Sequence, residues 1–139
     1  MAVAPQVNEF LGIDEEEAPT DVLTRLRQGL SFDAIENVRK ALDLTVDELA
    51  EVLAISARTL SRRKKSNLLA PDESDRVYRI ARVFAHAVDV FGSRQKAARW
   101  FKKPNPALGG TEPLAVFDTD LGTQMVDDIL TRVEFGVYG

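Results

Sequence analysis

A block of positive charge lies near the middle of this 139-residue chain. Between positions 54 and 66 there are five basic residues and no acidic one, although the whole chain carries a net charge of −4. Lysine and arginine donate charge-assisted hydrogen bonds to phosphate, and arginine can also bind a guanine edge through two parallel bonds. A basic patch on an acidic protein is therefore suited to nucleic acid. The candidate DNA-contacting residues are Ser56, Arg58, Thr59, Arg62, Arg63, Lys64 and Lys65.

Two short helices joined by a tight turn must position these side chains. Thr45 and Glu48 have the spacing of a capping box, and Ser56 is the next residue able to cap a helix. The apolar residues recur at helical spacing and predict an inward face. They are Val46, Leu49, Ala50 and Leu53 in the first helix and Leu60 in the second, with Ile55 in the turn. This layout is typical of a helix-turn-helix, whose second helix enters the DNA major groove.

Two positions depart from the usual motif. Ala54 occupies the turn position normally filled by glycine, where a left-handed backbone is needed. Arg63 stands where the second helix usually has one more core residue. The alternative interpretation is an ordinary helical hairpin with a solvated basic end, which would bind no DNA and serve only protein contacts.

The composition argues against catalysis. The chain has no cysteine and a single histidine, His86, which the helical spacing places on a polar face as an ordinary surface residue. No glycine-rich loop follows a strand, and Gly109-Gly110 is too short a signal for a nucleotide site. We therefore expect no enzyme, no cofactor and no metal. Neither a membrane span of roughly 18 apolar residues nor a secretory signal is visible, so a cytoplasmic location is expected.

The chain is predicted to be all-α, because no alternating strand pattern occurs. A leader and first helix occupy residues 1–30, with residues 1–19 a mobile tail or, alternatively, an arm packed on a neighbouring subunit. The helix-turn-helix region covers 31–70. A long connecting helix covers 71–92, with its regular pattern running from about Asp75 to Phe91. A small helical domain covers 93–139, with helices capped by Ser93 and Thr119.

The second half carries a specific resemblance. Its order of short motifs resembles the Xre/MbcA/ParS antitoxin family over roughly residues 31–139. The motifs are Glu73-Ser74-Asp75-Arg76, Val90-Phe91-Gly92, Ala97-Ala98-x-Trp100-Phe101, Pro104-Asn105-x-x-Leu108-Gly109-Gly110-x-x-Pro113-Leu114, Thr119-x-x-Gly122 and Arg132-Val133-Glu134-Phe135-Gly136-Val137-Tyr138.

The resemblance implies an antitoxin of a type II toxin–antitoxin module. Its helix-turn-helix would bind the operator of its own operon, and its C-terminal domain would bind and neutralise a RES-domain toxin, a class that resembles ADP-ribosyltransferases and depletes NAD⁺. The implied toxin-binding residues are Asn105, Leu108, Gly109, Gly110, Arg132, Glu134, Phe135, Val137, Tyr138 and Gly139.

The C-terminal tail suggests a mechanism. Phe135 and Tyr138 are aromatic anchors in a short segment with little charge, so the tail is expected to enter or cover the toxin's active site. Alternatively, both rings fold back onto the last helix. We expect a homodimer, because operators read by such motifs are usually two-fold symmetric, and a larger hetero-oligomer with toxin. The alternative function is a phage- or plasmid-type homodimeric repressor without a toxin partner.

Overall fold

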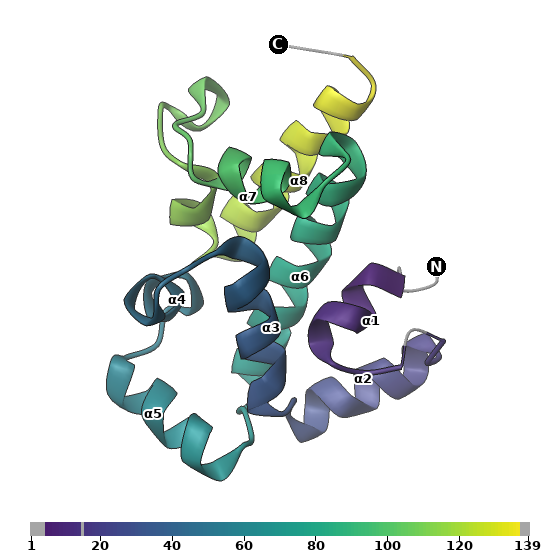
Figure 1. The fold of residues 1–139 in the computed structure, drawn as a ribbon, viewed down its shortest axis with the longest axis vertical. Helices are drawn as coiled ribbons and strands as arrows, with labels where there is room; N and C mark the ends of the chain where they lie inside the picture. The colour runs from purple at the N-terminus through teal and green to yellow at the C-terminus, as the bar shows by residue number, and fades with distance from the viewer. Residues whose placement is uncertain (1–4, 15, 137–139) are drawn as a thin grey trace.

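The computed structural model of the protein describes residues 5–14 and 16–136 (Figure 1). All regular elements among these residues are helices, so the predicted all-α class is confirmed; the one β-type feature is an isolated bridge between Asn105 and Thr111. The helices are α1 Pro5–Leu11, α2 Pro19–Gln28, α3 Phe32–Leu42, α4 Val46–Leu53, α5 Ala57–Ser66, α6 Pro71–Phe91, α7 Arg94–Phe101 and α8 Asp120–Glu134, with short 3₁₀ helices η1 Pro106–Leu108 and η2 Pro113–Val116.

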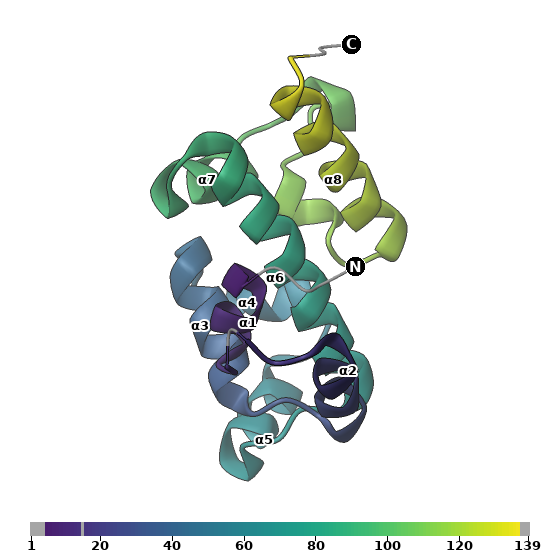
Figure 2. The ribbon, with the colours of Figure 1, turned by 90° about the vertical axis from the view of Figure 1, so that its right-hand side faces the viewer.

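The long helix α6 is the axis of the molecule. It packs against α1, α2, α3 and α4 along one part and against α7 and α8 along the other (Figures 1 and 2). Its buried stripe includes Val77, Ile80, Ala81 and Phe84. The helix begins at Pro71, four residues before the predicted start at Asp75, because proline suits the first helical position.

The N-terminal segment is folded, so the predicted mobile tail is wrong for the described residues. Val7, Phe10 and Leu11 share one face of α1 and are buried against the chain's own α3 and α6. Phe10 meets the ring of Phe84 edge-on at 5.4 Å, and the Arg94 guanidinium lies 4.7 Å from the centre of the Phe10 ring. Burial of these three apolar side chains, worth about 1.5–3 kcal/mol each, favours the packed helix and offsets part of the entropy lost on ordering it.

The helix-turn-helix has the predicted local structure. The Thr45 hydroxyl accepts a bond from the Glu48 N–H, and the Glu48 carboxylate accepts one from the Thr45 N–H. These backbone and side-chain bonds lower the pKa of Glu48. Leu49 and Leu60 are buried as expected. Val46 was expected to face inward, but it is 53% exposed and borders a shallow depression beside Leu49 and Leu60.

The turn residue Ala54 does adopt the left-handed conformation, with φ 55° and ψ 41°. Replacing Ala54 with glycine should stabilise the protein by about 0.5–1 kcal/mol, because the Cβ penalty of this conformation disappears. The measurement is the midpoint of thermal unfolding, which should rise by a few degrees. Asp43→Gly is the matched control, since Asp43 is also left-handed (φ 53°) but aspartate tolerates that region better. An equal gain at both positions would contradict the explanation.

The C-terminal helices contact α6 through aromatic rings and through polar side chains. Phe101 lies 5.7 Å from the ring of Phe84 and 5.4 Å from that of Phe117, so the hydrophobic core is continuous between the two halves. His86 is not an ordinary surface residue. Its side chain is only 21% exposed, and its Nδ1 lies 2.7 Å from Asp127 Oδ1 on α8.

The predicted caps of the C-terminal helices are confirmed. The Ser93 hydroxyl accepts from the Lys96 N–H at the start of α7, and the Thr119 hydroxyl accepts from the Gly122 N–H at the start of α8. The start of α2 differs: this helix begins at Pro19 after Ala18, and no side chain caps it.

Candidate functional site

The predicted functional residues lie at opposite ends of α6. Helix α5, with the basic block, forms one end of the molecule, whereas the loop around η1 and the last turn of α8 lie at the other end (Figures 1 and 2). The two candidate surfaces are therefore separated by the length of the molecule.

At the first end, α5 presents its cations to solvent. Arg58, Arg62, Lys64 and Lys65 are exposed, and within the described part of the chain none of them forms an ion pair. Unpaired exposed cations keep their full capacity to bind phosphate or base edges. This row of cations fits the predicted DNA-contacting surface.

Two hydroxyls at the start of α5 hold its first turn. The Ser56 Oγ accepts from the Thr59 N–H at 3.0 Å and also donates to the Thr59 Oγ1 at 3.0 Å. Arg62 Nη2 lies 3.5 Å from the same Thr59 oxygen. Ser56 therefore acts first as the helix cap. Arg58, two residues further on, is exposed in the first turn of α5, the end that a helix-turn-helix inserts into the major groove.

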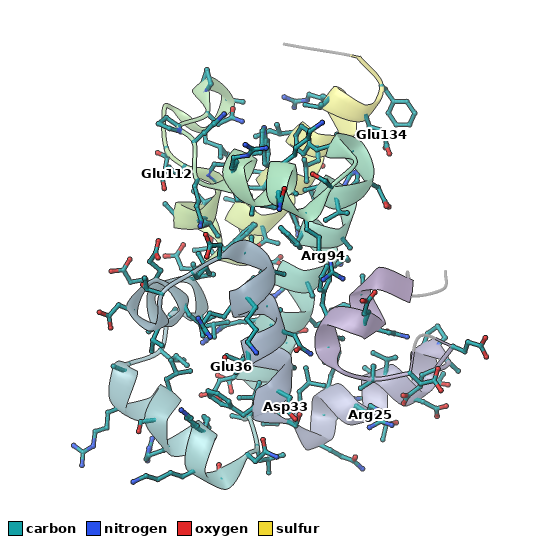
Figure 3. The ribbon with its side chains drawn as sticks, viewed as in Figure 1. Arg25, Asp33, Glu36, Arg94, Glu112 and Glu134 are labelled. Atoms are coloured by element: carbon teal, nitrogen blue, oxygen red, sulfur yellow. The ribbon has the colours of Figure 1, made fainter. Side chains whose placement is uncertain are left out.

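Lys64 lies on the side of α5 that faces α3. It borders the same depression as Glu36, whose position on α3 is labelled in Figure 3. The Arg39 side chain, through its hydrogen bonds, lowers the pKa of the Glu36 carboxyl, and the charge of Lys64 adds a smaller effect in the same direction. Lys64 therefore lies near a carboxylate of this chain, whereas Lys65 does not border this depression.

Arg63 differs from the other predicted DNA contacts. Its Nε donates to Glu73 Oε1 at 2.7 Å and its Nη2 to Glu73 Oε2 at 3.3 Å. The Glu73 side chain is only 5% exposed. Hydrogen bonding to Glu73 and the charge of this partner raise the pKa of Arg63. We therefore revise the prediction that Arg63 contacts DNA, since its guanidinium is turned inward.

At the second end, the loop between α7 and η2 closes on itself. The Asn105 N–H donates to the Thr111 carbonyl at 3.0 Å, and the Asn105 carbonyl accepts from the Gly110 N–H at 2.9 Å. Gly109 and Gly110 have φ of 66° and 84°, and no atom lies within 4 Å of where a Cβ would be. Glycine is therefore favoured at both positions by the backbone conformation and not by lack of space. The backbone of both residues is open to a partner. Leu108, also an implied toxin contact, is buried in this chain and anchors the loop from within.

The last turn of α8 projects apolar and charged side chains. Arg132 and Glu134 are exposed, and Phe135 is 72% exposed, so its ring does not fold back onto the helix. In the view of Figure 3, Glu134 lies at the end of α8, and Glu112 lies on the opposite side of α7 from Glu134. The Glu134 carboxylate is 3.6 Å from His86 Nε2. The predicted contacts Val137, Tyr138 and Gly139 lie outside the described residues.

Other features of the described chain offer little for small-molecule chemistry. No group of three or more His, Asp or Glu residues within 5–14 and 16–136 is arranged to hold a metal ion. An open cleft of about 320 Å³ between α4 and η2 is lined by Glu48, Glu51, Glu112 and Asp118. None of the helices described is both long and apolar enough to cross a membrane.

Two known protein families match this chain, one at each end of the molecule. The Antitoxin Xre-like helix-turn-helix domain matches residues 21–82, and the Antitoxin Xre/MbcA/ParS C-terminal toxin-binding domain matches residues 86–136. The first match contains α4 and α5, and the second contains η1 and all of α8. Each candidate surface therefore lies inside one of the two matched domains.

Individual proteins agree with the domain matches. Antitoxin Xre of Yersinia enterocolitica is 31% identical, with 86% of this chain and 82% of that protein covered. Antitoxin Xre of Pseudomonas putida is 32% identical, with 96% and 83% covered. The Prs ADP-ribosylating antitoxin of a Sphingobium strain is 22% identical over 87% of this chain and 82% of that protein.

The fold has a solved counterpart as well. A chain in the crystal structure of the M. tuberculosis MbcT-MbcA toxin-antitoxin complex aligns with a TM-score of 0.56 and 23% identity. The alignment covers 76% of the present chain and 94% of that chain. At this identity the similarity concerns the fold.

Proposed function

Because this chain belongs to the Xre/MbcA/ParS antitoxin family, we propose that it neutralises a RES-domain toxin encoded beside it and represses the operon of both proteins. The protein is an antitoxin with a toxin-binding domain at residues 86–136. The toxin class, the mode of inhibition and the operator are our proposal. The observation that carries it is the placement of two exposed, chemically different surfaces at opposite ends of α6.

Inhibition is proposed to be steric. Phe135 stands 72% exposed at the end of α8, and the chain continues from it as Gly136-Val137-Tyr138-Gly139. The exposed ring is a suitable anchor for an apolar pocket on the toxin. The open Gly109-Gly110 backbone, at the same end of the molecule, would form a second contact. The antitoxin would act by binding alone, without chemistry or cofactor of its own.

Repression is proposed to use α5. Two copies would place two such helices in successive major grooves of a two-fold operator. The toxin-binding end would point away from the DNA, so a homodimer could hold operator and toxin at the same time as a larger hetero-oligomer. Such targets place the protein in the cytoplasm.

Co-purification tests the proposed binding of a toxin. The adjacently encoded protein should co-purify with the tagged chain, and expressing that protein alone should lower cellular NAD⁺. Co-expression with this chain should restore the NAD⁺ level. A partner that co-purifies without any effect on NAD⁺ would refute the RES assignment. Failure to capture any adjacently encoded protein, together with operator binding, would favour the plain repressor.

The proposed operator binding is tested by comparing variants of two exposed cations of α5. Arg58→Ala should cost about 1–3 kcal/mol at one base pair of the operator and relax the sequence preference there. Lys65→Ala should weaken all duplexes alike and reduce the slope of log K against log salt by about 0.9. Binding is measured by fluorescence anisotropy on the operator and on a scrambled duplex. Identical behaviour of both variants would refute the placement of α5 in the groove.

A further inference from the structure

We infer that three residues at the start of α6, Glu73, Ser74 and Arg76, position the helix-turn-helix on DNA, and that Arg63 assists DNA reading from behind α5 without touching DNA. The inference rests on the operator binding proposed above. It gives a role to a sequence motif that neither the toxin-binding surface nor the basic block explains.

The first contact of this segment holds α5. Arg63 grips both oxygens of the Glu73 carboxylate, and Glu73 Oε1 also accepts from the Ala70 N–H at 2.8 Å. The carboxylate is thus satisfied by three donors although it is almost fully buried. A bidentate arginine–carboxylate pair fixes orientation as well as distance. The last turns of α5 are therefore tied to the first turn of α6.

The second contact holds α4. Arg76 Nη1 donates to the Leu53 carbonyl at 3.0 Å. Leu53 is the last residue of α4, where carbonyls lack a partner within the helix. The arginine thus satisfies a free carbonyl at the turn and also places a cation at the negative end of the α4 dipole. The two arginines fix the two helices of the motif to one shared support.

The third contact joins the first turns of α6, which form the support, to the loop that precedes α3. The Ser74 hydroxyl accepts from the Leu30 N–H at 2.8 Å and donates to the Ala70 carbonyl at 3.0 Å, and Ser74 is fully buried. The Leu69 N–H completes the network by donating to the Leu30 carbonyl at 2.8 Å. Both loops that flank the helix-turn-helix region are therefore fastened at the start of α6.

This network bears on DNA recognition because base contacts depend on sub-ångström placement. A hydrogen bond to a base edge is lost when the helix moves by about 1 Å, whereas attraction to phosphates is long-ranged and tolerant. Loosening the support should therefore lower the preference for the operator more than it lowers affinity for DNA in general. A phosphate contact behaves in the opposite way, since its loss weakens all sequences equally and flattens the salt dependence.

The experiment uses Arg63→Gln, the double variant Arg63→Gln/Glu73→Gln, and Arg82→Gln as a control. Arg82 is an exposed arginine of α6 outside the basic block. Affinity is measured by anisotropy on a duplex from upstream of the operon and on a scrambled duplex, over a range of salt concentrations. Arg63→Gln should lower the ratio of operator to scrambled affinity at least tenfold and leave the salt slope unchanged. The double variant, whose two amides can bond each other, should return the ratio to within about threefold of wild type.

Several results would overturn the inference. These are a salt slope reduced by about 0.9 in Arg63→Gln with an unchanged ratio, a ratio that the double variant does not recover, or a ratio that Arg82→Gln lowers in the same manner. If Arg63→Gln fails to fold by circular dichroism, Arg76→Gln at its half-buried site provides the same comparison with the same expected tenfold loss. A wild-type protein that does not prefer the operator at all would refute operator binding itself, and this inference with it.

Discussion

Replacing Gly122 with alanine is expected to destabilise the protein by about 3 kcal/mol or more, at the upper end of overpacking effects. A Cβ at this buried position would lie 1.9 Å from the Val116 carbonyl oxygen and 2.8 Å from the Val116 Cβ. Both atoms belong to η2, and the oxygen is backbone, so no rotamer change removes the clash. In an exposed helix the same substitution would gain about 1 kcal/mol from propensity, and the clash must exceed this gain.

The measurement is thermal unfolding followed by circular dichroism, with an expected fall of the midpoint of roughly 10 °C or more. Gln124→Ala is the control, because Gln124 lies two residues further along α8 and is exposed. An unchanged midpoint for Gly122→Ala would show that η2 does not pack against α8 as described. The variant should also lose toxin binding in proportion to the unfolded fraction.

Replacing Phe135 with alanine is expected to weaken toxin binding by about 2–4 kcal/mol, which is roughly a 30- to 1,000-fold rise in Kd. The ring is 72% exposed in the free protein, so its removal leaves the fold intact and acts on the complex alone. The measurement is isothermal titration of the adjacently encoded protein, together with cellular NAD⁺ on co-expression.

Leu121→Ala is the matched control for Phe135. Leu121 is also a large exposed apolar residue of α8, at 68%, but it lies at the other end of that helix. An equal loss of affinity in both variants would show that the toxin covers the length of α8 and is not anchored at its last turn. Deleting residues 137–139 tests whether the C-terminal tail plugs the toxin's active site or whether α8 only binds the toxin surface. A truncated chain that silences the toxin at equal stoichiometry would refute the plugging mechanism.

The helix-turn-helix could be predicted because its signals are local. The capping box at Thr45, the cap at Ser56 and the left-handed Ala54 each depend on residues within a few positions of one another. The same holds for the caps of α7 and α8 at Ser93 and Thr119. Local hydrogen bonds are set by residue type and spacing, so a sequence shows them directly.

The support beneath α5 could not be predicted in this way. The sequence shows that Arg63 stands at a core position of the motif, but it does not show the partner, because Glu73 is ten positions away. His86 likewise appeared as a surface residue, because its partner Asp127 lies 41 positions further on. Pairings across such distances depend on how α6 meets its neighbours, which spacing within one helix does not show. The burial of α1 was more accessible, since Val7, Phe10 and Leu11 already have helical spacing.

The length of α6 has a consequence for how the two proposed ligands, toxin and operator DNA, would affect each other. Its 21 residues span about 30 Å, whereas the Debye length at physiological salt is about 8 Å. Charges brought by a toxin at one end are therefore screened long before they reach phosphates at the other end. Electrostatic interference between the two ligands is small, and any influence of toxin on DNA affinity must pass mechanically through α6 and the side chains that clamp its neighbours.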